Sequence, residues 1–160
     1  MEGIIAGALA VMGTLLGAVI AHRFQEKAAN RAEGRARTHL QQERLFDTCA
    51  NFIRLAEDYR RAQYDRWSCW DEAPDGETAA AARTESYRLY VETRSSASYI
   101  KLASSRTDVQ QLADQANMVL ELTSAIIRTN DRADMLKRGE RAQEACDAFV
   151  AKANAVLHAA

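Results

Sequence analysis

The scarcity of turn-forming residues is the feature that most constrains the fold of this chain. Its 160 residues contain one proline and seven glycines, and four of those glycines lie within residues 3–21. Sheets of many strands need frequent turns, and turns draw heavily on Gly and Pro. A many-stranded β fold is therefore excluded, and the length predicts a single soluble domain at most. We expect an all-α protein.

Residues 3–21 contain no charged side chain. A helix of this length measures about 28 Å, close to the roughly 30 Å of bilayer hydrocarbon. We therefore predict a transmembrane anchor over residues 1–21. A cleaved signal peptide is the main alternative, because residues 19–21 resemble a cleavage site, but residues 1–2 lack the positive charge of a signal peptide. A buried core helix is a third alternative, which the length disfavours.

Small residues form one face of this predicted anchor. Gly3 and Gly7, and likewise Gly13 and Gly17, are separated by three residues. Such spacing lets two helix backbones approach closely in lipid. It predicts pairing of membrane helices, either in a homo-oligomer or with another membrane protein. The alternative is that Gly and Ala are simply frequent in the membrane helices of Ala-rich proteins.

Residues 22–44 are predicted to form a basic juxtamembrane stalk. They carry six basic and three acidic residues and have no apolar face. Arg23, Lys27 and Arg31 lie nearest the predicted anchor and are candidates for contact with lipid headgroups. They could equally reflect only the retention of positive charge inside the cell. Both readings predict a single-pass protein of the plasma membrane, with its N-terminus outside and its C-terminal domain cytoplasmic.

Residues 45–160 are predicted to form an antiparallel bundle of about four amphipathic helices. Apolar residues recur every three to four positions from 45 to about 70, from 77 to 103, from 109 to 127 and from 135 onward. Breaks fall at Pro74 and Gly76, at residues 104–108 and at residues 129–131, and such short connections favour antiparallel neighbours. For residues 77–103 the predicted inward side comprises Ala80, Thr84, Tyr87, Val91, Arg94 and Ser98, with Tyr90 and Ala97 beside it.

No motif for catalysis or cofactor binding is present. The three cysteines lie far apart and include no CxxC pair, and the three histidines are isolated from one another. Cys49 and Cys146 fall on apolar stripes and are expected to be small, reduced core residues. There is no phosphate-binding glycine loop and no set of nucleophile, base and acid. We expect no metal, no cofactor and no enzymatic activity.

Residues 57–70 combine arginine with tyrosine and tryptophan. Arg60, Tyr64, Trp67 and Trp70 are predicted to dock a protein partner, because Trp, Tyr and Arg dominate the energetics of interfaces. The alternative is that the two tryptophans pack beneath the loop containing Pro74 and close the end of the bundle. The chain has a net charge of −1, which does not favour nucleic acid as a partner.

Four short stretches resemble a known family. They are GTLLG at residues 13–17 with HRFQ at 22–25, QERL at 42–45, and YRRAQYDRW at 59–67. They resemble small actinobacterial membrane proteins of the KilB type, a group connected with conjugative plasmids. The resemblance implies a membrane-anchored accessory of plasmid transfer or spread and supplies no catalytic residue. We expect a non-enzymatic, membrane-tethered interaction module. The alternative is a structural stalk or scaffold subunit, like the b subunit of rotary ATP synthases.

Overall fold

The structure is a computed structural model that describes the backbone of residues 2–158 and the side chains of residue 33 and residues 36–158. The chain divides into two units, residues 1–41 and residues 42–160. Across the described backbone the secondary structure is helical and no strand occurs, so the predicted all-α class is confirmed.

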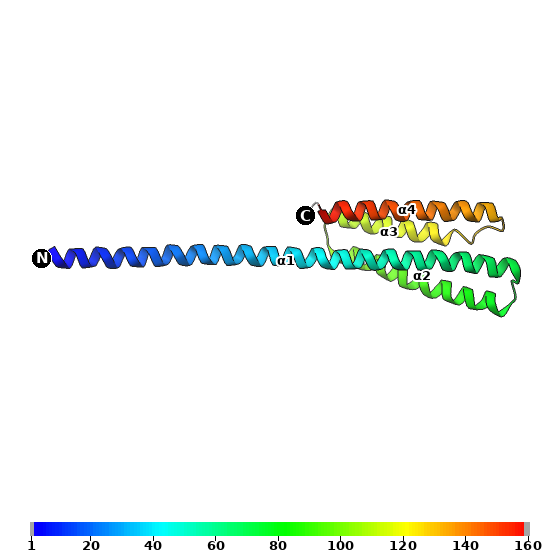
Figure 1. The fold of residues 1–160 in the computed structure, drawn as a ribbon, viewed down its shortest axis with the longest axis horizontal. Helices are drawn as coiled ribbons and strands as arrows, with labels where there is room; N and C mark the ends of the chain where they lie inside the picture. Colours follow the sequence, from blue (N-terminus) through cyan, green and yellow to red (C-terminus); the bar gives the residue numbers. More distant parts are fainter. Residues whose placement is uncertain (1, 159–160) are drawn as a thin grey trace. The chain divides into compact units, whose positions relative to one another are not determined.

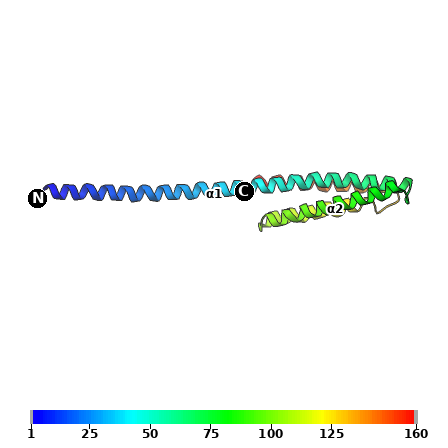
Figure 2. The same ribbon diagram turned by 90° about the horizontal axis from the view of Figure 1, so that it is seen from below.

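Four helices make up the described chain: α1 (Glu2–Glu72), α2 (Glu77–Ala103), α3 (Thr107–Ser124) and α4 (Arg132–His158). In the second unit, α2 runs back along the later part of α1, and α3 and α4 form a second hairpin beside them (Figure 1). Figure 2 shows the pairing of α2 with α1 from below. The predicted bundle of four antiparallel helices is thus confirmed for residues 42–158.

The first unit contains the part of α1 that precedes residue 42. The predicted anchor at residues 3–21 and its four glycines lie outside the residues whose side chains are described, as do Arg23, Lys27 and Arg31. Within the residues whose side chains are described, no helix is both long enough and apolar enough to cross a membrane. Among the side chains of this unit that are described, Arg37 forms an ion pair with Glu33, one helical turn earlier.

The core of the bundle consists of three clusters in sequence along its length. The largest lies where α1 enters the bundle, and there the rings of Phe52 and Phe149 pack with centroids 4.8 Å apart. A second cluster joins Tyr59 and Ala62 of α1 to Leu89 of α2 and Leu120 of α3. The third, which we call the tip cluster, consists of Trp67, Ile126, Met135 and Ala142.

A polar network is buried beside the second cluster. The amide of Gln63 is 1% exposed, and its Nε2 donates a hydrogen bond to the Tyr59 hydroxyl at 2.8 Å. The Ser86 hydroxyl of α2 donates to Oε1 of Gln63, also at 2.8 Å. A buried polar group is tolerated when its hydrogen bonds are satisfied. At this level α1 and α2 are therefore joined by the Ser86–Gln63 hydrogen bond as well as by apolar packing.

The predicted inward side of α2 is wrong. Ala80, Thr84, Tyr87, Val91, Arg94 and Ser98 are all exposed. The buried residues of the helix are Ala79, Ser86, Leu89, Thr93, Ser96, Ala97 and Ile100. The true face contains three small hydroxyl residues, which a search for apolar periodicity passes over. The Thr93 hydroxyl, for example, donates to the backbone oxygens of Leu89 and Leu55.

The stripes predicted for α3 and α4 largely match the buried residues. Two residues depart from them. Leu136, expected on the stripe of α4, is 48% exposed. Because α3 ends at Ser124, Ile127 lies in the following loop rather than on the helix. Two side chains hold that loop. The Trp67 indole N–H donates to the Thr129 backbone oxygen at 2.8 Å, and the Arg138 guanidinium donates to the Ala125 backbone oxygen at 3.2 Å.

Candidate functional site

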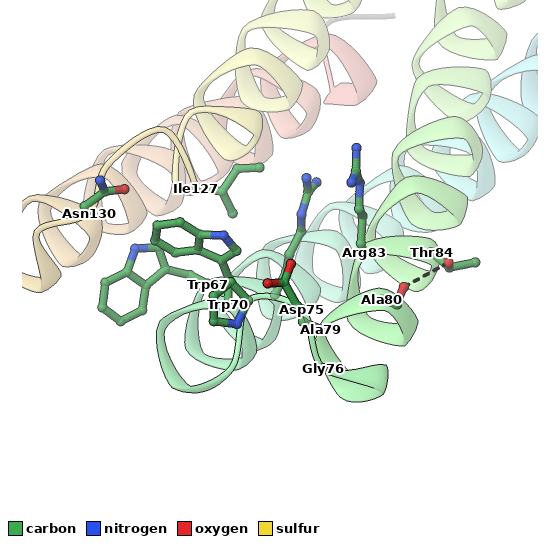
Figure 3. A pocket seen from close by; sticks show the side chains of 12 residues that line it. Trp67, Trp70, Asp75, Gly76, Ala79, Ala80, Arg83, Thr84, Ile127 and Asn130 are labelled. Carbon is green, nitrogen blue, oxygen red and sulfur yellow. Dashed lines mark hydrogen bonds between the residues drawn. The ribbon is translucent and has the colours of Figure 1, made fainter.

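A pocket opens at the end of the bundle that carries the α1–α2 and α3–α4 loops, an end we call the tip. The tip cluster draws its side chains from α1, α4 and the loop after α3, and no residue of α2 belongs to it. At this level the lining includes Ala79 and Ala80 of α2 and Gly76, which immediately precedes that helix. Because these residues are small, a space of about 710 Å³ remains between α2 and the rest of the tip (Figure 3).

The lining of this tip pocket comes from both hairpins. It consists of Arg66, Trp67, Trp70, Pro74, Asp75, Gly76, Ala79, Ala80, Arg83, Thr84, Ile127 and Asn130. Trp67, Trp70 and Ile127 form an apolar side, and Arg83 projects from α2 on the other side (Figure 3). The pocket thus pairs an aromatic wall with cationic groups.

The two tryptophans occupy different environments. Trp67 is only 6% exposed, belongs to the tip cluster and donates its N–H to the backbone of the following loop. Trp70 is 46% exposed. Trp67 therefore closes the bundle against the loop after α3, whereas Trp70 leaves much of its surface to solvent. The alternative that packs both tryptophans into the end of the bundle thus holds for Trp67 alone.

Two arginines reach the pocket from neighbouring helices. Burial, together with the charge of Arg83, lowers the pKa of the Arg66 guanidinium. In the part of the chain whose side chains are described, neither arginine forms an ion pair, although Asp75 also lines the pocket. Two guanidinium groups that disfavour one another, with a single carboxylate in the same lining, leave a net positive site for an anionic group.

Arg60 and Tyr64, the other two predicted docking residues, do not line the tip pocket, although Tyr64 packs against the tip cluster. They line a shallower hollow of about 360 Å³ over α4, together with Gly139 and acidic residues of that helix. The Arg60 guanidinium pairs with Glu57, and its buried Nε has no hydrogen-bond partner. The structure therefore brings Trp67 and Trp70 together in the tip pocket and separates Arg60 and Tyr64 from it.

Sequence reasoning did not single out Arg66 or Arg83. Arg66 lies in the stretch that drew attention and stands one helical turn before Trp70, a spacing that places both on one face. That spacing was a usable signal. Arg83 belongs to the next helix and comes near Arg66 only through folding, so nothing in its local sequence marks it.

The buried cysteines behave as core residues. Burial raises the pKa of both the Cys49 and the Cys146 thiol to about 11. Cys49, Cys69 and Cys146 are all free thiols. Among the residues whose side chains are described, no three His, Cys, Asp or Glu side chains lie close enough together to hold a metal ion.

Residues 42–158 thus form a four-helix bundle with an arginine-lined, aromatic pocket at its tip. The family model of the KilB plasmid transfer protein matches residues 46–157, which is nearly all of that bundle. The chain belongs to the KilB plasmid transfer protein family, as the resemblance of its sequence indicated, and this membership implies a role in plasmid transfer. Comparison with curated proteins and with solved structures finds no match.

Proposed function

We propose that this chain is a non-enzymatic, membrane-tethered accessory of conjugative plasmid transfer or spread, which recruits a protein partner through its bundle. The observation that carries the proposal is the tip pocket, where Trp70 stays exposed and two arginines lack an acidic partner. Exposed Trp and Arg in a concave site are the residue types that contribute most to protein interfaces. Family membership supplies the process in which such recruitment would serve.

The membrane tether is supported by the sequence. Residues 3–21 are uncharged, and the six basic residues of 22–44 follow them. In this proposal the span fixes the protein in the plasma membrane with the bundle in the cytoplasm, and Arg23, Lys27 and Arg31 contact anionic headgroups. The glycines at 3, 7, 13 and 17 pair the span with a second copy or with another membrane protein.

Tethering has a physical benefit for recruitment. Confinement of two proteins to one membrane raises their effective concentration, so a weak contact suffices for stable association. A pocket of modest area can then act as the recruiting surface without the 1,200–2,000 Å² that free association of two soluble proteins ordinarily buries. The bundle presents the contact, and the anchor supplies much of the affinity.

The tether can be tested by fractionation. The full chain should stay in the membrane pellet after a carbonate wash, whereas a variant without residues 3–21 should appear in the supernatant. A reporter that is active only in the cytoplasm should work when it is fused to the C-terminus, whereas a reporter that is active only outside the cell should not. A full chain released by carbonate, or a C-terminal reporter active outside the cell, would overturn the tether or its orientation.

Recruitment is tested by crosslinking in the native membrane of cells that carry the plasmid, followed by identification of the adducts. We expect one or a few heterologous proteins to be recovered in constant proportion to the chain. Recovery of self-adducts alone would contradict recruitment and indicate a homo-oligomer. A parallel mating assay should show lower plasmid transfer for the variant that lacks residues 3–21, since the unanchored bundle loses its local concentration.

A further inference from the structure

We infer that the tip pocket binds an acidic segment of the partner protein that also inserts a large apolar side chain between α2 and the two tryptophans. This inference rests on the proposed function and adds to it the chemistry of the partner. It depends on two separate features of the pocket, its charge and its unfilled volume.

The charge of the pocket is opposite to that of the bundle around it. Residues 45–160 carry 15 basic and 18 acidic side chains. The charged residues of the pocket, in contrast, are Arg66, Arg83 and Asp75, which leave one positive charge in excess. A carboxylate brought between the two guanidiniums gains charge-assisted hydrogen bonds and relieves their mutual repulsion. An acidic segment is therefore the occupant that this charge distribution favours.

The volume of the pocket calls for an apolar group as well. Trp67, Trp70 and Ile127 line it on one side, and the apolar residues that α2 contributes to the lining, Ala79 and Ala80, are small. At about 710 Å³ the space exceeds what a single carboxylate fills. An apolar side chain of the partner would complete the tip cluster, at the level where α2 contributes none of its own.

Nucleic acid fits these observations less well. A phosphate backbone would have to lie along a bundle surface of net negative charge, and only two arginines are at hand to bind it. The Asp75 carboxylate, which also lines the pocket, would repel the phosphates. A crosslink to nucleic acid would therefore contradict the inference.

The test places a photo-reactive side chain in the pocket of the full-length protein, in its native membrane. Thr84→p-benzoylphenylalanine puts the probe at an exposed position that lines the pocket. Ser98→p-benzoylphenylalanine is the matched control, since it is exposed on the same helix, about 21 Å further along, and does not line the pocket. Adducts are digested, and the crosslinked peptide is sequenced by mass spectrometry.

Charge-reversal variants identify the groups responsible. Arg66→Glu with Arg83→Glu should lower the yield of the Thr84 adduct by about tenfold or more, the change expected when one strong contact is lost. Arg61→Glu with Arg94→Glu makes the same change in net charge on the same two helices, at exposed positions outside the pocket, and should leave the yield within about twofold. Far-ultraviolet circular dichroism verifies that both pairs remain folded.

Ala79→Leu tests the volume separately from the charge. The added side chain fills part of the pocket from the α2 side, so the Thr84 adduct should fall in yield while the bundle keeps or gains thermal stability. Raising the salt concentration to about 1 M should weaken the adduct as well, because screening acts over about 3 Å at that ionic strength.

The inference is supported if the peptide crosslinked at Thr84 has net negative charge and depends on Arg66 and Arg83. It is overturned if that peptide is neutral or basic, if the adduct is nucleic acid, or if both probe positions crosslink equally. It is also overturned, while the proposed function survives, if native-membrane crosslinking still recovers the partner from the Arg66→Glu/Arg83→Glu variant at undiminished yield. Failure of the full chain to recruit any partner would instead overturn the proposed function.

Discussion

At the scale of single residues, the contact between Tyr64 and Gly139 fixes how closely α1 and α4 approach. A Cβ atom built on Gly139 would lie 1.5 Å from the Tyr64 hydroxyl oxygen and 2.5 Å from the ring carbon that bears it. The glycine is thus required by the tyrosine ring rather than by any unusual backbone angle, since no glycine in the described backbone has a positive φ. Because Gly139 has no side chain, the Tyr64 ring can pack directly against the backbone of α4.

Gly139→Ala should therefore destabilise the protein. In an ordinary helix interior the change would stabilise by about 1 kcal/mol. Here we expect a net loss of about 1–3 kcal/mol, because the added methyl group overpacks the contact. Denaturant unfolding followed by circular dichroism measures the change. In a Tyr64→Ala background the same substitution should be neutral or stabilising, and a loss of equal size there would show that Tyr64 is not the cause.

The two buried thiols predict how stability changes at alkaline pH. Burial raises the pKa of Cys49 and Cys146 from 9.0 to about 11, so the folded chain keeps these protons where the unfolded chain loses them. Stability is then fully present below about pH 9 and falls as the pH rises toward 11, by up to about 1.4 kcal/mol per pH unit for each thiol.

Unfolding measured from pH 8 to pH 11 tests this dependence. A Cys49→Ala/Cys146→Ala variant should be less stable at pH 8, because the cavities cost free energy, but its stability should decline less steeply. Cys69→Ala is the control, since that residue is only partly buried and belongs to none of the three core clusters. Parallel pH profiles for all three proteins would contradict the assignment to buried thiols.

At the scale of elements, α2 marks the limit of what periodicity predicts. The bounds expected for this helix agree with the structure, because Pro74, Gly76 and the residues at 104–108 punctuate the chain clearly. Its buried face was mistaken because Ser86 and Thr93 face inward and Tyr87 and Val91 outward. Burial of those hydroxyls depends on partners in α1, such as Gln63, and partners far along the chain leave no mark on a local pattern.

The register of α2 can be tested with two neighbouring residues. Leu89→Ala should cost about 2–5 kcal/mol, because Leu89 is 6% exposed and belongs to the second cluster. Val91→Ala, two positions along at a residue that is 44% exposed, should change stability by no more than about 0.5 kcal/mol. Both are measured by denaturant unfolding. A larger loss of stability for Val91→Ala than for Leu89→Ala would instead support the buried face that apolar periodicity predicts for α2.

At the scale of the whole molecule, the sequence predicts the bundle well and the pocket poorly, for one physical reason. Stripes such as Val109, Leu112 and Ala116 follow from local spacing and agree with the buried faces of their helices. The pocket exists because α2 supplies no large apolar side chain to the tip cluster. Such a gap becomes visible only when the other three helices are in place.

The same packing predicts that the bundle folds without the residues before it. The three core clusters draw their members from residues 45–157, and residues 42–160 form one compact unit. A fragment of residues 42–160 should therefore unfold cooperatively on heating and keep the helical content expected of four helices. A fragment of residues 52–160 is the control, since it lacks Leu45 and Cys49 and should unfold at least about 5 °C lower. Gradual, non-cooperative melting of the longer fragment would mean that the bundle depends on residues 1–41 for its stability as well as for its proposed place in the membrane.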